Sequence, residues 1–294
     1  MLDRLVVILA RFLFESLRAL PLRGAARLGR FFGGMAHLVD RRHRKVAVTN
    51  LTAVFGNEKT RNQIAALARE NFKRIGESFV CGVCTAGISP LDLDKILEVD
   101  GGEKLLEVGE DGRSPSRILA LGHFGNFEIF ATAAHRLPGM QLVTTYRAVK
   151  PAALNDLLLS YRQSLNCVFL ERTRDAAKLK SMLKAGGVVI GLLSDQNGGP
   201  RGIKGPFLGV ECSTSAAPAV FARRFHYPFH VAVCYRTSLA RWRIEISDAI
   251  PLLENGGIRT AEAITADMNR IFEEAVRRDP ANWFWVHNRW RLVA

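Results

Sequence analysis

The chain of 294 residues has few cysteines and no long uncharged apolar run. Its five cysteines are too sparse for a disulfide scaffold, so reduced thiols are expected. No run reaches the roughly 18 uncharged residues that a membrane-spanning helix needs. Apolar residues make up 48% and charged residues 23%, which excludes disordered, collagen-like and polytopic membrane proteins. The composition indicates a globular chain with one large or two medium domains.

Common signatures of metal and nucleotide sites are also missing. Cys81 and Cys84 have the spacing of a zinc or redox pair, but they fall on a helical pattern and no second pair exists. Gly198 and Gly199 are not followed by the Gly-Lys-Ser/Thr of a P-loop. Neither a metal ion nor another cofactor is therefore expected.

Positive charge is abundant and unevenly distributed. The net charge is +13, and residues 1–50 hold ten Lys and Arg against three acidic residues, which gives +7 for this segment alone. A basic N-terminal segment suits either nucleic acid or an anionic membrane surface. No aromatic-interleaved basic patch and no known nucleic-acid module accompany the charge, so nucleic acid is not expected as a partner.

The apolar content of the N-terminal segment favours the membrane surface. Residues 5–22 read as a helix on which Arg4, Arg11, Glu15 and Arg18 fall within about 60° of one another. The remaining face carries Val6, Val7, Leu9, Phe12, Leu13, Leu17 and Leu20. A narrow charged stripe beside a wide apolar face predicts a helix that lies in the bilayer interface. The alternative is an amphipathic helix packed on the protein's own core, with solvated arginines.

The rest of the chain alternates strands and helices, which predicts an α/β fold with a largely parallel central sheet flanked by helices. Strands are predicted at 117–121, 142–146, 167–170, 188–193, 229–235 and 242–246, and helices at 60–81, 122–134, 151–166, 174–185, 217–225 and 260–278. Residues 90–111 read as an acidic loop, and 197–209 as a loop rich in glycine and proline. We predict a helical, membrane-associating region over 1–111, packed against an α/β domain over 112–294.

One segment carries the residues of a catalytic site. His123 stands five positions before Glu128, at a predicted turn from a strand into a helix. With Glu128 in the first helical turn, its carboxylate can reach the imidazole, fix the tautomer and leave the other nitrogen as a base. Gly125 gives the turn backbone freedom, and free N–H groups at the start of the helix can hold a developing oxyanion. No Ser or Cys nucleophile occupies the turn, so the base would activate a substrate hydroxyl. A structural or capping histidine is the alternative.

The segment Gly122-His123-Phe124-Gly125-Asn126-Phe127-Glu128 closely resembles the His-x4-Asp/Glu motif of the glycerolipid acyltransferase superfamily. Four further segments resemble one branch of it, the late acyltransferases of lipid A biosynthesis. They are Asn50-Leu51 with Val54-Phe55-Gly56; Tyr146-Arg147 with Arg162; Asp195-Gln196-Asn197 through Gly202 to Pro206-Phe207-Leu208-Gly209, Thr214 and Ala217; and Asp279-Pro280 with Trp283-Phe284-Trp285-Val286-His287 and Arg289-Trp290. The resemblance covers nearly the whole chain in order.

This resemblance implies an enzyme that moves a fatty acyl chain from acyl carrier protein to a hydroxyl of a membrane glycolipid, a lipid A precursor. It further implies a peripheral or monotopic protein on the cytoplasmic face of the bacterial inner membrane. By the same resemblance His123 is the general base and Glu128 its partner. The implied substrate-binding residues are Gly125, Asn126, Arg147, Arg162, Asp195, Gln196, Arg201 and Lys204, of which Arg147 would hold a phosphate of the acceptor or of the donor's pantetheine.

Several alternatives remain open on the sequence. Arg201 and Lys204 could reach lipid phosphates from their glycine-rich loop or be solvated. Residues 212–216 lack the bulkier or basic side chains expected beside Thr214, which leaves the choice of acceptor open. A lysophospholipid, a phosphatidylinositol mannoside or another lipid is the alternative acceptor. A catalytically silent membrane-surface protein is the alternative outside enzymes.

Overall fold

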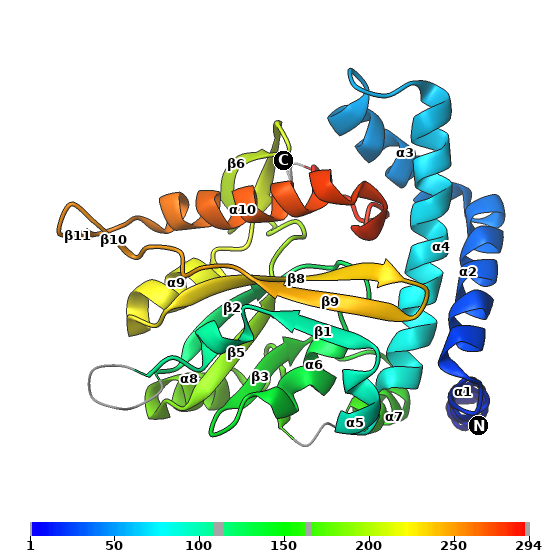
Figure 1. Ribbon diagram of the computed structural model, residues 1–294, viewed down its shortest axis with the longest axis horizontal. Coiled ribbons are helices and arrows are strands. Elements are labelled where there is room, and N and C mark those ends of the chain that lie inside the picture. The colour runs from blue at the N-terminus through cyan, green and yellow to red at the C-terminus, as the bar shows by residue number, and fades with distance from the viewer. Residues whose placement is uncertain (1, 109–114, 163–165, 292–294) are drawn as a thin grey trace.

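The structure is a computed structural model that describes residues 2–108, 115–162 and 166–291. Its centre is a seven-stranded sheet in the order β1-β9-β8-β2-β5-β3-β4 (Figure 1). The strands are β1 (Leu97–Asp100), β2 (Arg117–Leu121), β3 (Gln141–Tyr146), β4 (Cys167–Glu171), β5 (Val188–Leu193), β8 (Phe229–Ser238) and β9 (Arg241–Ile246). Only β8 and β9 pair antiparallel among these described strands, so the predicted α/β fold with a largely parallel sheet is confirmed.

Both faces of the sheet are covered, because alternate residues of each strand point to opposite sides. On β2, Ile118 and Ala120 join one buried apolar cluster, and Leu119 and Leu121 join another. The helices that flank the sheet are α6 (Ile129–Ala133), α7 (Ala152–Arg162), α8 (Ala176–Ala185), α9 (Ala217–Phe225) and α10 (Ala261–Arg278). In Figure 1, α10 lies above the sheet and α6 below it.

Four helices form the N-terminal region: α1 (Leu2–Arg18), α2 (Leu22–Val39), α3 (Arg41–Phe55) and α4 (Arg61–Thr85). A capping box begins α4, with reciprocal hydrogen bonds between Thr60 and Gln63. Helices α2 and α4 cross in close contact because glycines face each other there. A Cβ atom on Gly33 would lie 2.2 Å from the carbonyl oxygen of Phe72. None of the described helices is long and apolar enough to cross a membrane.

The prediction of an acidic loop over residues 90–111 is wrong for most of that segment. The segment forms α5 (Pro90–Asp94), the edge strand β1 and the short helix η1 (Gly102–Leu105). Leu93, Leu97 and Leu105 are buried, because β1 extends the sheet beside β9 and its neighbours cover the sheet edge. The end of this segment, and with it the predicted boundary between 111 and 112, lies outside the described residues. The division into two regions therefore stays a prediction.

Other differences concern element ends and loops. The first helix ends at Arg18 rather than Leu22, and the predicted extension of α7 through 163–165 lies outside the described residues. The glycine-rich loop at 197–209 contains β6 (Ile203–Phe207), which pairs with β7 (Val210–Thr214) in a hairpin. The remaining short elements are η2 (Ala134–Arg136), β10 (Leu253–Glu254), β11 (Gly257–Ile258) and η3 (Pro280–Asn282).

Candidate active site

The site lies at the carboxyl ends of β2 and β5, which are neighbours in the sheet. The parallel register places Leu121 opposite Leu193. His123 and Asp195 each follow two residues later, so the register brings the imidazole and the carboxylate to the same point. Ligand and catalytic groups of open α/β sheets gather at this edge, outside the carboxyl ends of the strands.

Asp195 holds His123 at two points. The Nδ1 atom of His123 lies 2.7 Å from Oδ1 of Asp195, and the backbone N–H of His123 donates to Oδ2 at 2.8 Å. The indole N–H of Trp283 donates to the same Oδ2 at 2.7 Å. Asp195 is fully buried, whereas the His123 side chain is 15% exposed. The carboxylate is thus enclosed, and the imidazole that it orients reaches the surface of the site.

The electrostatics of this pair define the tautomer of His123. Burial alone would raise the pKa of Asp195, but the charge of His123 and the hydrogen bonds from His123 and Trp283 outweigh it and hold that pKa below its ordinary value. Asp195 is therefore ionised at neutral pH and accepts a hydrogen bond from Nδ1–H of the imidazole. The Nε2 atom of neutral His123 is then unprotonated, which is the form that acts as a base.

Glu128 does not occupy the position that the sequence suggested. It accepts two hydrogen bonds from Arg162, one from Nε at 3.0 Å and one from Nη2 at 2.7 Å. The expectation that Glu128 orients the imidazole is corrected, because Asp195 takes Nδ1. The physical reason is the path of the chain after His123: Phe124 forms a β-bridge with Trp283, and α6 begins only at Ile129. This detour carries Glu128 toward α7, where Arg162 lies.

The backbone N–H groups of the turn are mostly engaged. Those of Phe124 and Gly125 donate to the carbonyls of Gly122 and Asn282. The N–H groups of Phe127 and Glu128, which directly precede α6, have no hydrogen bond within the described part of the chain. Potential oxyanion donors therefore lie directly before α6.

Gly125 and Asn126 shape this turn. Gly125 has φ +49°, and a Cβ atom there would lie 2.6 Å from the carbonyl oxygen of Cys234. Asn126 is fully buried, and its side-chain amide donates to the hydroxyl of Thr85 at 3.2 Å. The structure therefore places the Asn126 side chain against α4, where it ties the turn to the helix rather than facing a substrate.

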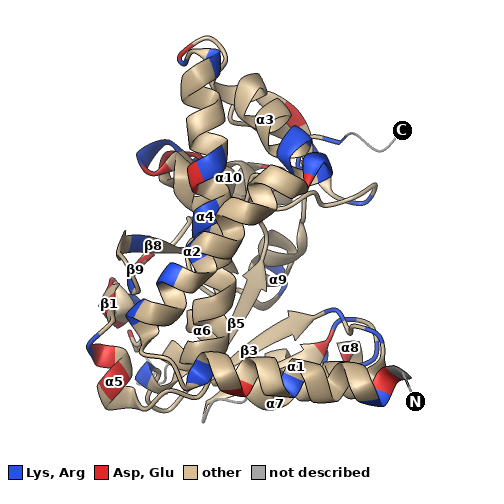
Figure 2. Cartoon of the chain, turned by 90° about the vertical axis from the view of Figure 1, so that its right-hand side faces the viewer, with Lys and Arg blue, Asp and Glu red and all other residues tan. Residues whose placement is uncertain are grey.

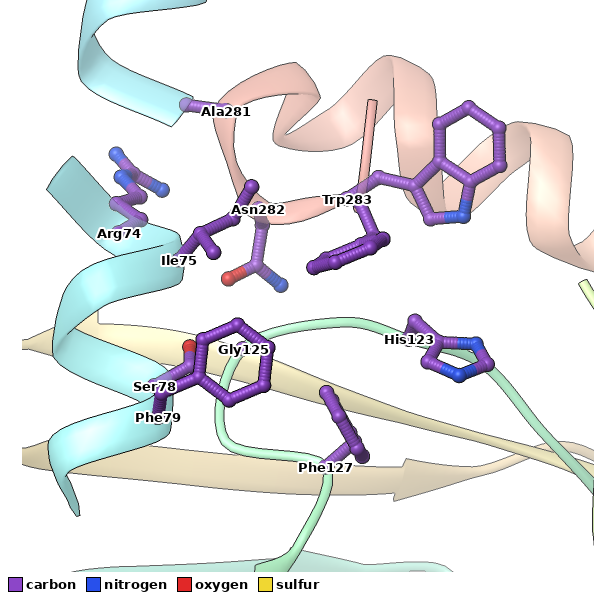
Figure 3. A pocket seen from close by; sticks show the side chains of 11 residues that line it. Arg74, Ile75, Ser78, Phe79, His123, Gly125, Phe127, Ala281, Asn282 and Trp283 are labelled. Carbon is purple, nitrogen blue, oxygen red and sulfur yellow. The ribbon is translucent and has the colours of Figure 1, made fainter. Parts of the chain in front are cut away.

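An apolar pocket borders the imidazole. Figure 3 shows His123 and Phe127 on one side of this pocket and Phe79 of α4 on another, with Trp283 above. The rings of Phe127 and Phe284 lie 4.9 Å and 6.0 Å from the imidazole, measured between ring centroids. The imidazole is thus bordered by apolar aromatic side chains.

The C-terminal tryptophans and Arg289 support the site from within the core. Trp283 and Trp285 are buried, so both side chains pack in the core. Arg289 is fully buried and donates to the carbonyl of Gln196 at 3.1 Å and to the hydroxyl of Thr214 at 2.6 Å. It thereby fixes the residue that follows Asp195. Sequence spacing gave no indication that Arg289 contacts Gln196 and Thr214, although Arg289 lies in the C-terminal motif that resembles the family.

The remaining predicted residues are not brought to the imidazole. Arg147 follows β3 and is exposed, and Arg201 and Lys204 are exposed near the β6–β7 hairpin. Gln196 contributes its backbone carbonyl to Arg289. Their roles in substrate binding therefore stay predictions. The structure does bring together His123, Asp195 and Trp283, with the Glu128–Arg162 pair at the start of α6.

Comparison with known proteins identifies the family of this chain. No curated protein matches the chain closely enough to count as a relative. A family described as bacterial lipid A biosynthesis acyltransferase matches residues 1–292. The chain therefore belongs to the bacterial lipid A biosynthesis acyltransferases.

Proposed function

We propose that this protein transfers a fatty acyl chain from the thioester of acyl carrier protein to a hydroxyl of a lipid A precursor, with His123 as general base. The observation that carries the proposal is the His123–Asp195 pair. Asp195 fixes the imidazole through Nδ1, and Nε2 is left for a proton at the border of an apolar pocket. The family indicates acyl transfer as the class of reaction, and the His123–Asp195 pair supports general-base catalysis as its mechanism.

The proposed reaction proceeds by direct transfer. Nε2 of His123 takes the proton of the lipid hydroxyl as the oxygen attacks the thioester carbonyl carbon. Asp195 stabilises the imidazolium ion that forms. The tetrahedral intermediate collapses to the ester, the carbon–sulfur bond breaks, and the departing thiolate receives the proton from His123. No covalent acyl-enzyme is needed.

The start of α6 is proposed to stabilise the negative charge of the intermediate. The N–H groups of Phe127 and Glu128 are available there to donate to an oxyanion. The Glu128–Arg162 pair bounds the same turn. Glu128 is proposed to act at the site by holding Arg162 and the turn in place, which replaces its expected role as the partner of the imidazole.

Membrane binding is proposed through exposed apolar side chains of the first two helices, here called the apolar surface. Its members on α1 are Leu5, Val6, Ile8, Leu9, Phe12 and Leu13, and those on α2 are Phe31, Phe32, Met35, Leu38 and Val39, each at least 36% exposed. Figures 1 and 2 place both helices at the same edge of the molecule. So many exposed large apolar side chains on two helices are unusual on a protein surrounded by water. The basic residues nearby suit the anionic, cytoplasmic face of the inner membrane.

The experiment is acyl transfer by purified protein from acyl carrier protein thioester to a lipid A precursor in mixed micelles, followed by mass spectrometry. His123→Ala should lower turnover by about 100- to 10,000-fold, the usual contribution of a general base. His226→Asn is the matched control, because His226 is an exposed histidine in the left-handed region, which asparagine tolerates. A parent rate in His123→Ala, or transfer only to a lysophospholipid or phosphatidylinositol mannoside, would contradict the proposal.

A further inference from the structure

A second cavity lies away from the imidazole, between α1 and α7. It has a volume of about 380 Å³ and is lined by Arg11, Glu15 and Arg18 of α1 and by Ser160 and Tyr161 of α7. The turn that follows α4 closes a third side. A water molecule takes up about 30 Å³ in the liquid, so the cavity is large enough for a phosphate together with part of the group that carries it. Its lining is polar and includes two guanidinium groups.

The cavity lies beside the apolar surface, because the charged stripe of α1 that lines it separates the least exposed face of the helix from that surface. A narrow face with Val7, Ala10, Phe14 and Leu17 is the least exposed part of the helix. The charged stripe predicted from the sequence adjoins that face, and the exposed residues of the apolar surface complete the circle. When the apolar surface lies in the bilayer interface, the charged stripe and the cavity are at the depth of the lipid headgroups.

The two arginines differ in how they are held. One Nη of Arg18 donates to the carbonyl of Ala86 at 2.8 Å, and its guanidinium lies 5.4 Å from the centre of the Tyr161 ring. Arg18 is thus positioned in advance, with further N–H groups left to donate. Arg11 has no hydrogen bond or ion pair within the described residues. An anion in the cavity would accept hydrogen bonds from the free N–H groups of both arginines.

Glu15 is the competing anion. It accepts a hydrogen bond from the hydroxyl of Tyr161, and this hydrogen bond raises the pKa of Tyr161. The three charged side chains of the cavity sum to one net positive charge. Tyr161 also directly precedes Arg162, which holds Glu128, so the cavity and the candidate active site share the end of α7.

We propose that this cavity binds the phosphate of a phosphomonoester lipid headgroup through Arg11 and Arg18. Arginine forms paired, charge-assisted hydrogen bonds with phosphate, and the doubly charged monoester suits the cavity better than a diester does. This inference deepens the proposed function and rests on it, because the headgroup would belong to the phosphorylated lipid that accepts the acyl chain. A free phosphate ion has the same chemistry, and the test separates the two sources.

The test is calorimetric titration of the full chain with dihexanoyl phosphatidic acid below its micelle concentration. Arg11→Gln should weaken binding by about tenfold or more, because it removes charge-assisted hydrogen bonds. Arg18→Gln should do the same, and Glu15→Gln should tighten binding. Arg4→Gln is the matched control, since Arg4 lies on the same charged stripe but does not line the cavity. Thermal unfolding of each variant separates loss of binding from loss of fold.

Each outcome decides the proposal. Equal weakening by Arg4→Gln and Arg11→Gln would overturn it in favour of diffuse electrostatic attraction. Inorganic phosphate that binds as tightly as the lipid would overturn the lipid headgroup as the source, and so would equal binding of dihexanoyl phosphatidylcholine. The titration needs no acyl transfer and can be repeated in His123→Ala. A chain that binds the lipid at Arg11 but transfers no acyl group would refute the proposed function alone.

Discussion

His123 and Asp195 occupy equivalent positions on adjacent parallel strands, each two residues beyond the paired Leu121 and Leu193. The register of β2 against β5 therefore builds the pair directly, without a specialised loop. Because both residues leave the sheet at the same edge, the carboxylate is buried beneath the imidazole, and the imidazole keeps one nitrogen toward the substrate. A rigid parallel sheet thus supplies the precise placement that general-base catalysis requires.

Asp195→Asn should lower turnover by about 100- to 10,000-fold, because the amide no longer favours the tautomer with Nδ1 protonated. It should also change the dependence of stability on pH. The pKa of Asp195 is lowered in the folded chain from its ordinary 3.8, so the ionised carboxylate adds stability above that value. This stability is lost as pH falls through the folded-state pKa. Thermal unfolding should show the full parent-to-variant difference at neutral pH and a shrinking one below about pH 4.

Glu128→Gln and Arg162→Gln should each lower turnover by about ten- to 100-fold, since each leaves the other charge without its partner. The double variant should be little worse than either single one, because the two residues act as one unit. Arg162→Lys should recover part of the activity but not all of it, since lysine cannot form the paired contact. Steady-state kinetics of the four chains measures the coupling. Additive losses would show that the two residues act separately.

Gly33→Ala should destabilise the chain by about 1 to 3 kcal/mol or more through overpacking, because the added Cβ atom would lie 2.2 Å from a carbonyl oxygen of α4. Gly24→Ala on the same helix is the matched control. No atom lies within 4 Å of its added Cβ, so better helix propensity should stabilise the chain by up to about 1 kcal/mol. Denaturant unfolding measures both, and equal effects would refute close contact between α2 and α4.

Phe31→Ser with Phe32→Ser should weaken binding to vesicles that contain phosphatidylglycerol by more than about tenfold. Burial of each phenylalanine side chain in the interface contributes about 1.5 to 3 kcal/mol. Val220→Ser is the control, because Val220 is 42% exposed on α9 and lies outside the apolar surface. Sedimentation with vesicles at two salt concentrations measures the loss. If the double variant sediments with vesicles as the parent does, α2 does not take part in membrane binding.

The strand and helix patterns predicted most of the sheet, because buried parallel strands leave short apolar runs bounded by turn residues. The edge strand β1 was missed, since its alternation of apolar and acidic side chains covers only four residues within an acidic stretch. The hairpin of β6 and β7 was missed because its first strand lies in the segment 197–209, which is rich in glycine and proline. For β1, pairing with the distant strand β9 outweighed local composition; for β6, pairing with the adjacent strand β7 did so.

The sequence by itself determined the type of fold, the family, the position of His123 at a strand end and the amphipathic character of α1. These features depend on local periodicity and on the order of motifs along the chain. Only the tertiary structure decided which carboxylate serves the imidazole. Glu128 is nearer in sequence, but Asp195, 72 residues away, is nearer in space, because the order of strands in the sheet places β5 beside β2. Strand order depends on long-range packing, which the local pattern of residues does not encode.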